Sequence, residues 1–526
     1  MTSIKTMLAL AALIPLSSVA CDEGAEAPSD DGVAEVVLPG KADNYLSPTS
    51  REYRVWGMGE VTLEAEWAEQ SAAALQAEVD RRLGYRFKAY AHFINQFVTD
   101  KSAHDDNDGY GEFAGLVRGS SLEFIVEQVD DQGLLWAFIW EVEMGGPRDM
   151  LERLPIERDD SGQAYFTVEL PKLSQRDLEY TRYPRAFDPS TYTGETEALQ
   201  VMIDPVEATP DSYPEYLRLA DDGVIDVLVV VGGDYNDKRY DLLSAESHYG
   251  WLKKAGFSHP TSAWTELTLD SPPFEKVISM NGEDVRVLIT LVHPDIVEDA
   301  DLDDLRGVIT KGYETADVVI YDGHAGQDPT YSGVVYHYNP RHAIAANALA
   351  DLALPDKYQV YVFNGCKTYG AYPEAVYKSA AKDYGNLDVV STVSFSWLSQ
   401  QTFTTSGLLT ELLSLDSRRH DPRTWRELLT RINKHSNSNV YYGVHGIEDN
   451  PHLNPYADAD SLCTSCGRHN DCPGQGNMCV GMRGGSICTA ECTADDGCPD
   501  GYICGDIAVG GRVTDHQCVP AGYTCQ

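Results

Sequence analysis

Between Val224 and Asn450 the chain alternates short apolar runs with segments of helical periodicity. This alternation predicts a three-layer α/β domain with a mostly parallel sheet, because buried parallel strands read as continuous apolar runs joined by helical crossovers. The runs expected to be strands are Val224–Val231, Val285–Val292, Ala316–Tyr321, Gln359–Phe363 and Leu387–Val393. The segments expected to be helices are Leu243–Ala255, Leu302–Lys311, Arg341–Leu352, Ala371–Asp383, Ser406–Leu415 and Thr424–Lys434. The α/β domain is assigned to residues 210–455.

Ten of the twelve cysteines lie in the last 64 residues. Within this tail the spacing of Cys466 to Cys479 nearly repeats in Cys492 to Cys504. Regular spacing in a small, glycine-rich exported segment predicts a disulfide framework, since so short a segment has too little core to fold without covalent links. We therefore expect residues 456–526 to form a small disulfide-stapled repeat domain with up to five bridges, whose connectivity the spacing leaves open.

Zinc binding is the alternative role for the first two cysteines of the tail, in the segment Cys463-Thr-Ser-Cys466. Such a pair can supply two thiolates to a structural zinc ion. An oxidising compartment favours disulfides instead. No metal site is therefore predicted.

Residues 1–21 resemble the export signal of a bacterial lipoprotein. A nearly unbroken apolar stretch is followed by small residues that lead to Cys21. Lipoprotein signals end in such a cysteine, which is acylated after cleavage, although Ser18 stands where leucine is usual. Ordinary cleavage after Ala20 is the alternative. An acidic linker over residues 22–44 follows, so we expect a lipid-anchored protein of the bacterial cell envelope, facing the periplasm or the cell surface.

Residues 45–209 predict an α+β N-terminal domain. A strand pair is expected over Tyr53–Glu66, and amphipathic helices are expected over Ala68–Arg82 and Tyr85–Val98. A small antiparallel sheet is expected from the runs Ser121–Val129, Leu134–Glu143 and Ala164–Leu170. One alternative role for this domain is a propeptide-like cover, released by cleavage near Asp221 and Asp222.

The charge balance excludes one class of partner. Acidic residues outnumber basic residues by 82 to 40, which gives a net charge of −42. A protein of this charge repels phosphate backbones, so nucleic acid is not an expected partner. His104–Gly109 differs from a calcium loop in its first and closing residues and is interpreted as an acidic surface turn. No cofactor is predicted, and membrane contact is expected through the lipid anchor.

The cysteine count leaves Cys366 as an unpaired thiol, which in an exported protein is a candidate nucleophile. Cys366 follows the predicted strand Gln359–Phe363, and His324 follows the predicted strand Ala316–Tyr321. The segment between these strands is long enough for a right-handed crossover, so the strands can be neighbours with both residues at one sheet edge. A nearby imidazole can deprotonate a thiol and later protonate a leaving amine.

A structural role is the alternative for both residues. A cysteine after a strand is often a small buried apolar side chain. His293 also ends an apolar run, so a histidine in that position is not diagnostic by itself. The pairing of two correctly ordered strand ends, each with a neighbouring glycine (Gly323 and Gly365), favours a catalytic site.

The two strand ends resemble the caspase-like cysteine peptidases of clan CD, including the gingipains and the bacterial CHAT domains. The matching segments are Val-Val-Ile-Tyr-Asp-Gly-His324-Ala325-Gly326 and Val-Tyr-Val-Phe-Asn-Gly365-Cys366-Lys-Thr-Tyr-Gly370. The order of histidine before cysteine also matches. The resemblance covers roughly residues 224–450, and it implies a caspase-like three-layer fold and peptidase activity.

The resemblance also implies roles for individual residues. His324 would act as general base and acid, Cys366 as nucleophile, and the amides of Cys366 and Ala325 as the oxyanion hole. The family has glycine directly after the histidine, so Ala325 is a departure, with Gly326 next to it. Substrate-binding residues are expected at Asp234, which would favour a basic residue before the scissile bond, and at Trp397. Asp234 also fits an ordinary turn after a strand.

The sequence therefore predicts an exported cysteine endopeptidase that acts on protein or peptide substrates through a His–Cys dyad. The alternative is a catalytically inactive caspase-like envelope lipoprotein that functions in binding or adhesion.

Overall fold

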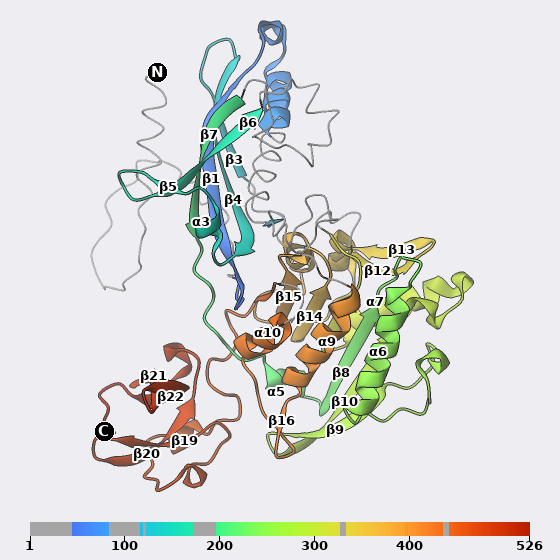
Figure 1. Cartoon of the computed structure of the whole chain (residues 1–526), viewed down its shortest axis with the longest axis vertical. Helices are drawn as coiled ribbons and strands as arrows, with labels where there is room; N and C mark the ends of the chain where they lie inside the picture. The colour runs from blue at the N-terminus through green and yellow to red at the C-terminus, as the bar shows by residue number, and fades with distance from the viewer. Residues whose placement is uncertain are drawn as a thin grey trace.

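The computed structural model describes residues 45–83, 116–118, 123–171, 196–326, 333–394, 396, 398–434 and 441–525. They form an N-terminal β-rich part, a central α/β part and a disulfide-rich tail (Figure 1). The predicted signal with Cys21, the linker at 22–44, the helix expected at 85–98 and the acidic turn at 104–109 lie outside the described residues. Among the helices of the described ranges, none has the length and apolar character needed to cross a bilayer.

The central part is built on a mixed sheet of nine strands, in the order β16-β17-β9-β10-β8-β11-β14-β15-β18. The five parallel strands at its centre are β10 (Glu283–Val292), β8 (Val224–Val231), β11 (Val318–Asp322), β14 (Gln359–Asn364) and β15 (Leu387–Thr392). The flanking strands are β9 (Phe274–Met280), β16 (Leu415–Asp416), β17 (Arg419–His420) and β18 (Tyr442–His445). All five predicted strands are confirmed. The sheet is mixed because β9 and β18 run antiparallel to their neighbours β10 and β15.

Helices cover both faces of this sheet, because successive side chains of each strand point to opposite faces. Val227 and Val229 of β8 pack into one apolar cluster, and Leu228 and Val230 pack into another. The first cluster lies under α6 (Tyr240–Lys254), α9 (Leu398–Leu412) and α10 (Trp425–Asn433). The second lies under α7 (Leu302–Thr315) and α8 (Tyr372–Val376). The two layers of helices make the three-layer arrangement predicted from the sequence (Figure 1).

Three of the predicted helices are wrong in extent or type. The helix expected over 406–415 is α9, which begins at Leu398 and ends at Leu412, and Leu415 belongs to β16. The segment 341–352 forms the strand β13 (Arg341–Ala345) and a 3-10 helix (Ala346–Asp351), and β13 pairs with β12 (Gly333–Tyr338) in a hairpin. Pairing across this hairpin, with Ile344 opposite Val334, overrides the helix propensity of the alanines. The helix expected over 371–383 is limited to α8, which ends at Val376.

The N-terminal part is a seven-stranded sheet whose strands pair antiparallel. Its strands are β1 (Ser50–Thr62), β2 (Leu116–Val117), β3 (Glu123–Gln128), β4 (Leu135–Pro147), β5 (Glu157–Arg158), β6 (Ala164–Pro171) and β7 (Thr196–Pro205). The strand pair expected over 53–66 is instead one long strand, β1, because β4 pairs with it along its whole length. Residues 72–83 are helical, as predicted for the first amphipathic helix.

The tail is a four-stranded sheet held by five disulfides. Its strands are β19 (Met478–Met482), β20 (Gly485–Glu491), β21 (Tyr502–Val509) and β22 (Arg512–Pro520). The bridges are Cys463–Cys525, Cys466–Cys479, Cys472–Cys488, Cys492–Cys504 and Cys498–Cys518. Each repeat holds four cysteines when Cys488 and Cys518 are counted as the last of the first and second repeat. In both repeats the first cysteine bonds to the third and the second to the fourth.

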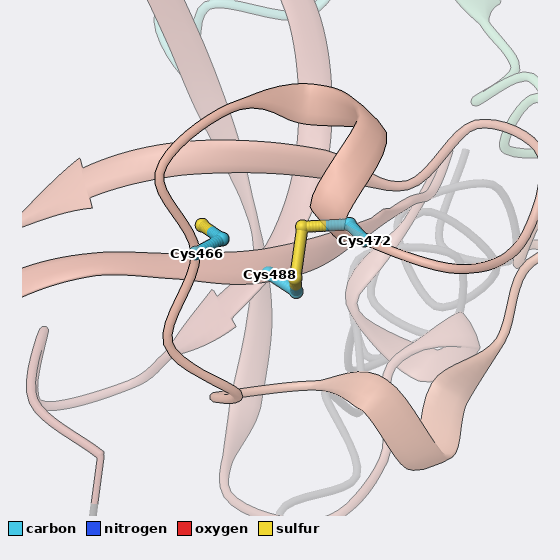
Figure 2. Close-up of side chains that lie close together, drawn as sticks. All are labelled: Cys466, Cys472 and Cys488. Atoms are coloured by element: carbon cyan, nitrogen blue, oxygen red, sulfur yellow. A yellow bond between two sulfur atoms is a disulfide. The ribbon is translucent and has the colours of Figure 1, made fainter.

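The cysteines of the zinc alternative are used in separate bridges: Cys463 bonds to Cys525 and Cys466 to Cys479. Figure 2 shows Cys466 beside the bridge between Cys472 and Cys488. The ligand atoms of these three cysteines lie within 4.8 Å of one another. The sulfurs gather because two bridges pack together, and a sulfur in a disulfide is not the thiolate that zinc requires.

Candidate active site

Three loops meet at the carboxyl edge of the central sheet. Strand β11 lies between β8 and β14, with Asp322 opposite Val231 on one side and Asn364 on the other. The chain places β10 on one side of β8 and β11 on the other, so the strand order reverses between β8 and β11. Ligands of open α/β sheets bind at such a reversal. The loop after β8 carries Asp234, the loop after β11 carries His324, and the loop after β14 carries Cys366.

His324 and Asp234 form a hydrogen-bonded pair across this reversal. The His324 Nε2 lies 2.9 Å from the Asp234 Oδ1. The Asp234 carboxylate also accepts hydrogen bonds from Asn236 and from the Tyr240 backbone N–H. Burial acts to raise the pKa of Asp234, but these hydrogen bonds outweigh burial and hold its pKa below the usual range. Asp234 is therefore ionised and can orient and stabilise a protonated imidazole.

Aromatic side chains surround the His324 ring. Tyr235 stacks on it with ring centroids 4.6 Å apart, and Tyr338 of β12 meets it edge-on at 5.6 Å. Tyr235 is 55% exposed, so it covers the imidazole from the solvent side. The ring is thus held by one carboxylate and two aromatic neighbours.

Cys366 is a free, partly exposed thiol. Its Sγ donates a hydrogen bond to the Ser396 carbonyl oxygen at 3.4 Å, so in this state the thiol is directed at Ser396 and not at His324. Burial raises the pKa of the Cys366 thiol, and the neighbouring Lys367 opposes that rise. The same burial lowers the pKa of Lys367 to about 8. The resting thiol is therefore protonated at neutral pH and needs a base before it can attack a substrate.

The loops that carry His324 and Cys366 are in direct contact. A Cβ added at Gly365 would lie 2.5 Å from the Ala325 Cβ and 2.9 Å from the Gly323 carbonyl oxygen. Both distances are shorter than packed atoms tolerate, so only glycine fits at position 365. The missing Cβ of Gly365 leaves the space that the Ala325 methyl group fills. The alanine that departs from the family pattern is thus accommodated by the residue next to Cys366.

Two backbone N–H groups at this edge have no hydrogen-bond acceptor among the described residues. Across the described part of the chain, neither the N–H of Ala325 nor that of Cys366 makes a hydrogen bond. These are the two groups that the resemblance to caspase-like peptidases would assign to an oxyanion hole. Free N–H donors beside a nucleophile can stabilise the negative oxygen of a tetrahedral intermediate.

A buried polar network fixes the acceptor of the Cys366 thiol. The Ser396 hydroxyl donates to the Asn364 Oδ1 at 2.8 Å, and the Asn364 Nδ2 donates to the Asp322 Oδ1 at 2.7 Å. The Thr405 hydroxyl also donates to the Asp322 carboxylate, and His248 lies 2.7 Å from it. Asp322 and Asn364 are fully buried. The backbone around Cys366 is therefore anchored to both neighbouring strands.

The structure brings together four of the predicted site residues: Asp234, His324, Ala325 and Cys366. The contact of Asp234 with His324 was not predicted, because the sequence suggested a substrate contact or a turn. Trp397 and Cys21 lie outside the described residues, so their predicted roles stay predictions. Sequence reasoning also gave no role to Asn364, the last residue of β14, or to Ser396, four residues after the end of β15, although polar residues at a sheet edge are candidates.

The chain matches no protein-family model and no curated protein. The function is therefore argued from the geometry of the site.

Proposed function

We propose that residues 210–455 form a caspase-like peptidase domain that hydrolyses peptide bonds through Cys366 and His324. The observation that carries this proposal is the meeting of the two loops at the strand reversal, with Gly365 against Ala325 and His324 paired to Asp234. A purely structural cysteine after a strand does not require an oriented histidine on the same edge, nor two N–H donors that have no partner among the described residues.

The proposed reaction follows the chemistry of an activated thiol. With Nε2 bonded to Asp234, the His324 Nδ1 is left to accept the proton of Cys366. The Sγ then attacks the scissile carbonyl carbon, and the oxyanion is received by the N–H groups of Ala325 and Cys366. His324 returns the proton to the leaving amine as the C–N bond breaks. Water, deprotonated by His324, hydrolyses the resulting thioester and restores the thiol.

Asp234 has a different role in this proposal from the one predicted. Because its carboxylate is occupied by His324 and by its own loop, it serves to orient the imidazole and to stabilise the imidazolium. Recognition of the residue before the scissile bond is assigned to groups other than Asp234, and Trp397 keeps the substrate-binding role predicted from the sequence. The proposed substrate is a protein or peptide outside the cytoplasm. The predicted signal that ends at Cys21 would export the enzyme and anchor it to the membrane, where it meets this substrate.

The proposal is tested by peptide turnover. We expect the purified chain to cleave members of a fluorogenic peptide library that varies the residue before the scissile bond. Cys366→Ala should lower the rate at least about 10³-fold, because no other group replaces the nucleophile. Turnover that is equal in wild type and Cys366→Ala would contradict the proposal.

The inactive binding protein is the second candidate, and one observation favours it. The Cys366 Sγ donates a hydrogen bond to the Ser396 carbonyl oxygen and burial raises the pKa of the thiol, so the resting thiol is mostly protonated. Under this alternative no library member is cleaved, although the chain is folded. Catalytic hydrogen bonds often form only when substrate is bound, which is why the resting geometry is compatible with the peptidase.

A further inference from the structure

The segment that follows Cys366 packs into the core of the N-terminal sheet. Tyr369 and Val393 are fully buried in an apolar cluster whose other members come mainly from residues 45–203. A Cβ added at Gly145 of β4 would lie 2.5 Å from the Val393 Cγ1 and 3.3 Å from the Tyr369 ring. Strand β4 therefore rests directly on the two loops that surround Cys366 and Ser396. Figure 1 shows the ends of β1 and β4 directed at the central part.

A buried polar cluster joins the same elements. The Tyr369 hydroxyl donates a hydrogen bond to the Glu52 Oε1 of β1 at 2.6 Å, and the Tyr45 N–H donates to the other carboxylate oxygen at 3.0 Å. Arg118, which follows β2, lies 3.7 Å from Glu52 and donates to Glu374 of α8 at 2.6 Å. Glu52 and Arg118 are each 2% exposed. The cluster thus holds Tyr369 and Glu374, which lie three and eight residues after Cys366.

The segment that leads into the N-terminal sheet also pairs with the central sheet. Leu46 pairs with Val444 of β18, and Tyr45 fills the space above Gly443. The propeptide-like cover considered above would be released from the central part. The surface that it leaves behind would then have to stay folded by itself. Here removal would expose the fully buried Tyr369 ring and separate Glu374 from Arg118, which is itself 2% exposed.

We propose that Glu52 and Tyr369 are positioning residues for Cys366, so that the N-terminal sheet sets the conformation and reactivity of the catalytic loop. This inference rests on the proposed function. The loop from Cys366 to Gly370 is short, and Lys367 in it adopts a left-handed conformation that surrounding contacts must maintain. The hydrogen bond from Tyr369 to Glu52 supplies one such contact from a residue 317 positions away in the sequence.

Tyr369→Phe tests the proposal, because it removes only the hydroxyl group. Its matched control is Tyr361→Phe, which removes a buried hydroxyl from β14 that bonds to Tyr313 and Gln359 away from the site. We expect Tyr369→Phe to lower kcat at least about tenfold with KM changed less than about threefold, since loop geometry and not substrate binding is altered. Glu52→Gln should change kcat in the same direction, and Tyr361→Phe should leave it unchanged.

A second readout separates this inference from the proposed function. Alkylation of Cys366 by iodoacetamide, followed across pH by mass spectrometry of the peptide that contains it, reports the thiol pKa without peptide turnover. We expect Tyr369→Phe to shift this pH profile relative to wild type and Tyr361→Phe to reproduce the wild-type profile. If Tyr369→Phe and Tyr361→Phe give the same profile, the hydroxyl is merely structural and the proposal is overturned. If wild type cleaves no peptide but Tyr369→Phe still shifts the alkylation profile, the proposed peptidase activity is contradicted and the positioning role of Tyr369 is not.

Discussion

His324→Ala should lower kcat/KM for peptide hydrolysis at least about 10³-fold, because the Cys366 thiol is protonated at rest and His324 is the base in the proposed reaction. Burial raises the pKa of this thiol, so only a small fraction is thiolate at neutral pH. General acid–base catalysis contributes about 10² to 10⁴ in rate, and His324 supplies both the base and the acid in the proposed reaction. Initial rates on the best library peptide measure the effect, with His342→Ala as a control on a histidine of the β12–β13 hairpin.

Asp234→Asn belongs in the same experiment, because it tests the orientation of the ring. The amide of asparagine can donate to the His324 Nε2, which would favour the tautomer that carries its proton on Nδ1 and cannot accept the thiol proton. We expect kcat to fall at least about tenfold with little change in KM. A full-activity Asp234→Asn variant would contradict the orienting role, and a full-activity His324→Ala variant would contradict the dyad.

Gly365→Ala should abolish most activity by separating the two catalytic loops. The added methyl group would lie 2.5 Å from the Ala325 Cβ and 2.9 Å from a backbone oxygen, so the backbone must move. Overpacking of this kind costs about 1–3 kcal/mol of stability, and a shift of about 1 Å in a catalytic group costs about 10² in rate. The loss of activity should therefore exceed what the change in thermal unfolding explains.

The double variant Gly365→Ala/Ala325→Gly is the matched rescue. It removes the Cβ–Cβ collision but leaves the contact with the Gly323 oxygen, so we expect partial recovery of kcat. Gly250→Ala, at a helical position with no neighbour within 4 Å, controls for the substitution itself. Loss of activity in the double variant equal to that in Gly365→Ala would mean that the two loops do not communicate through this contact.

The central sheet could be predicted because its strands are buried on both faces. Val224–Val231 is apolar except for Asp226 and lies between Gly223 and Gly232, and its predicted bounds are those observed. The segment 341–352 could not be assigned correctly, because its alanines fit a helix and only the partner strand β12 makes it a strand. The local sequence pattern predicts the secondary structure of strands that are buried on both faces. Where a segment has a weak preference, pairing with a distant strand determines its secondary structure.

For the site, the sequence placed the residues but not their contacts. His324 and Cys366 were found from strand ends, and the placement of both at one edge follows from parallel register. The bond between His324 and Asp234 depends on which strand lies beside β11, and topology alone determines that. The contact of Tyr369 with Glu52 joins residues 317 positions apart and has no local signature.

The central claim is that Cys366 becomes a nucleophile with the help of His324. Its most direct test is to treat the chain with a peptidyl acyloxymethyl ketone and to locate the adduct by peptide mass spectrometry. We expect one adduct, on Cys366, that is absent in Cys366→Ala and forms at least about tenfold more slowly in His324→Ala. No adduct on Cys366, or an adduct that forms equally fast without His324, would contradict it.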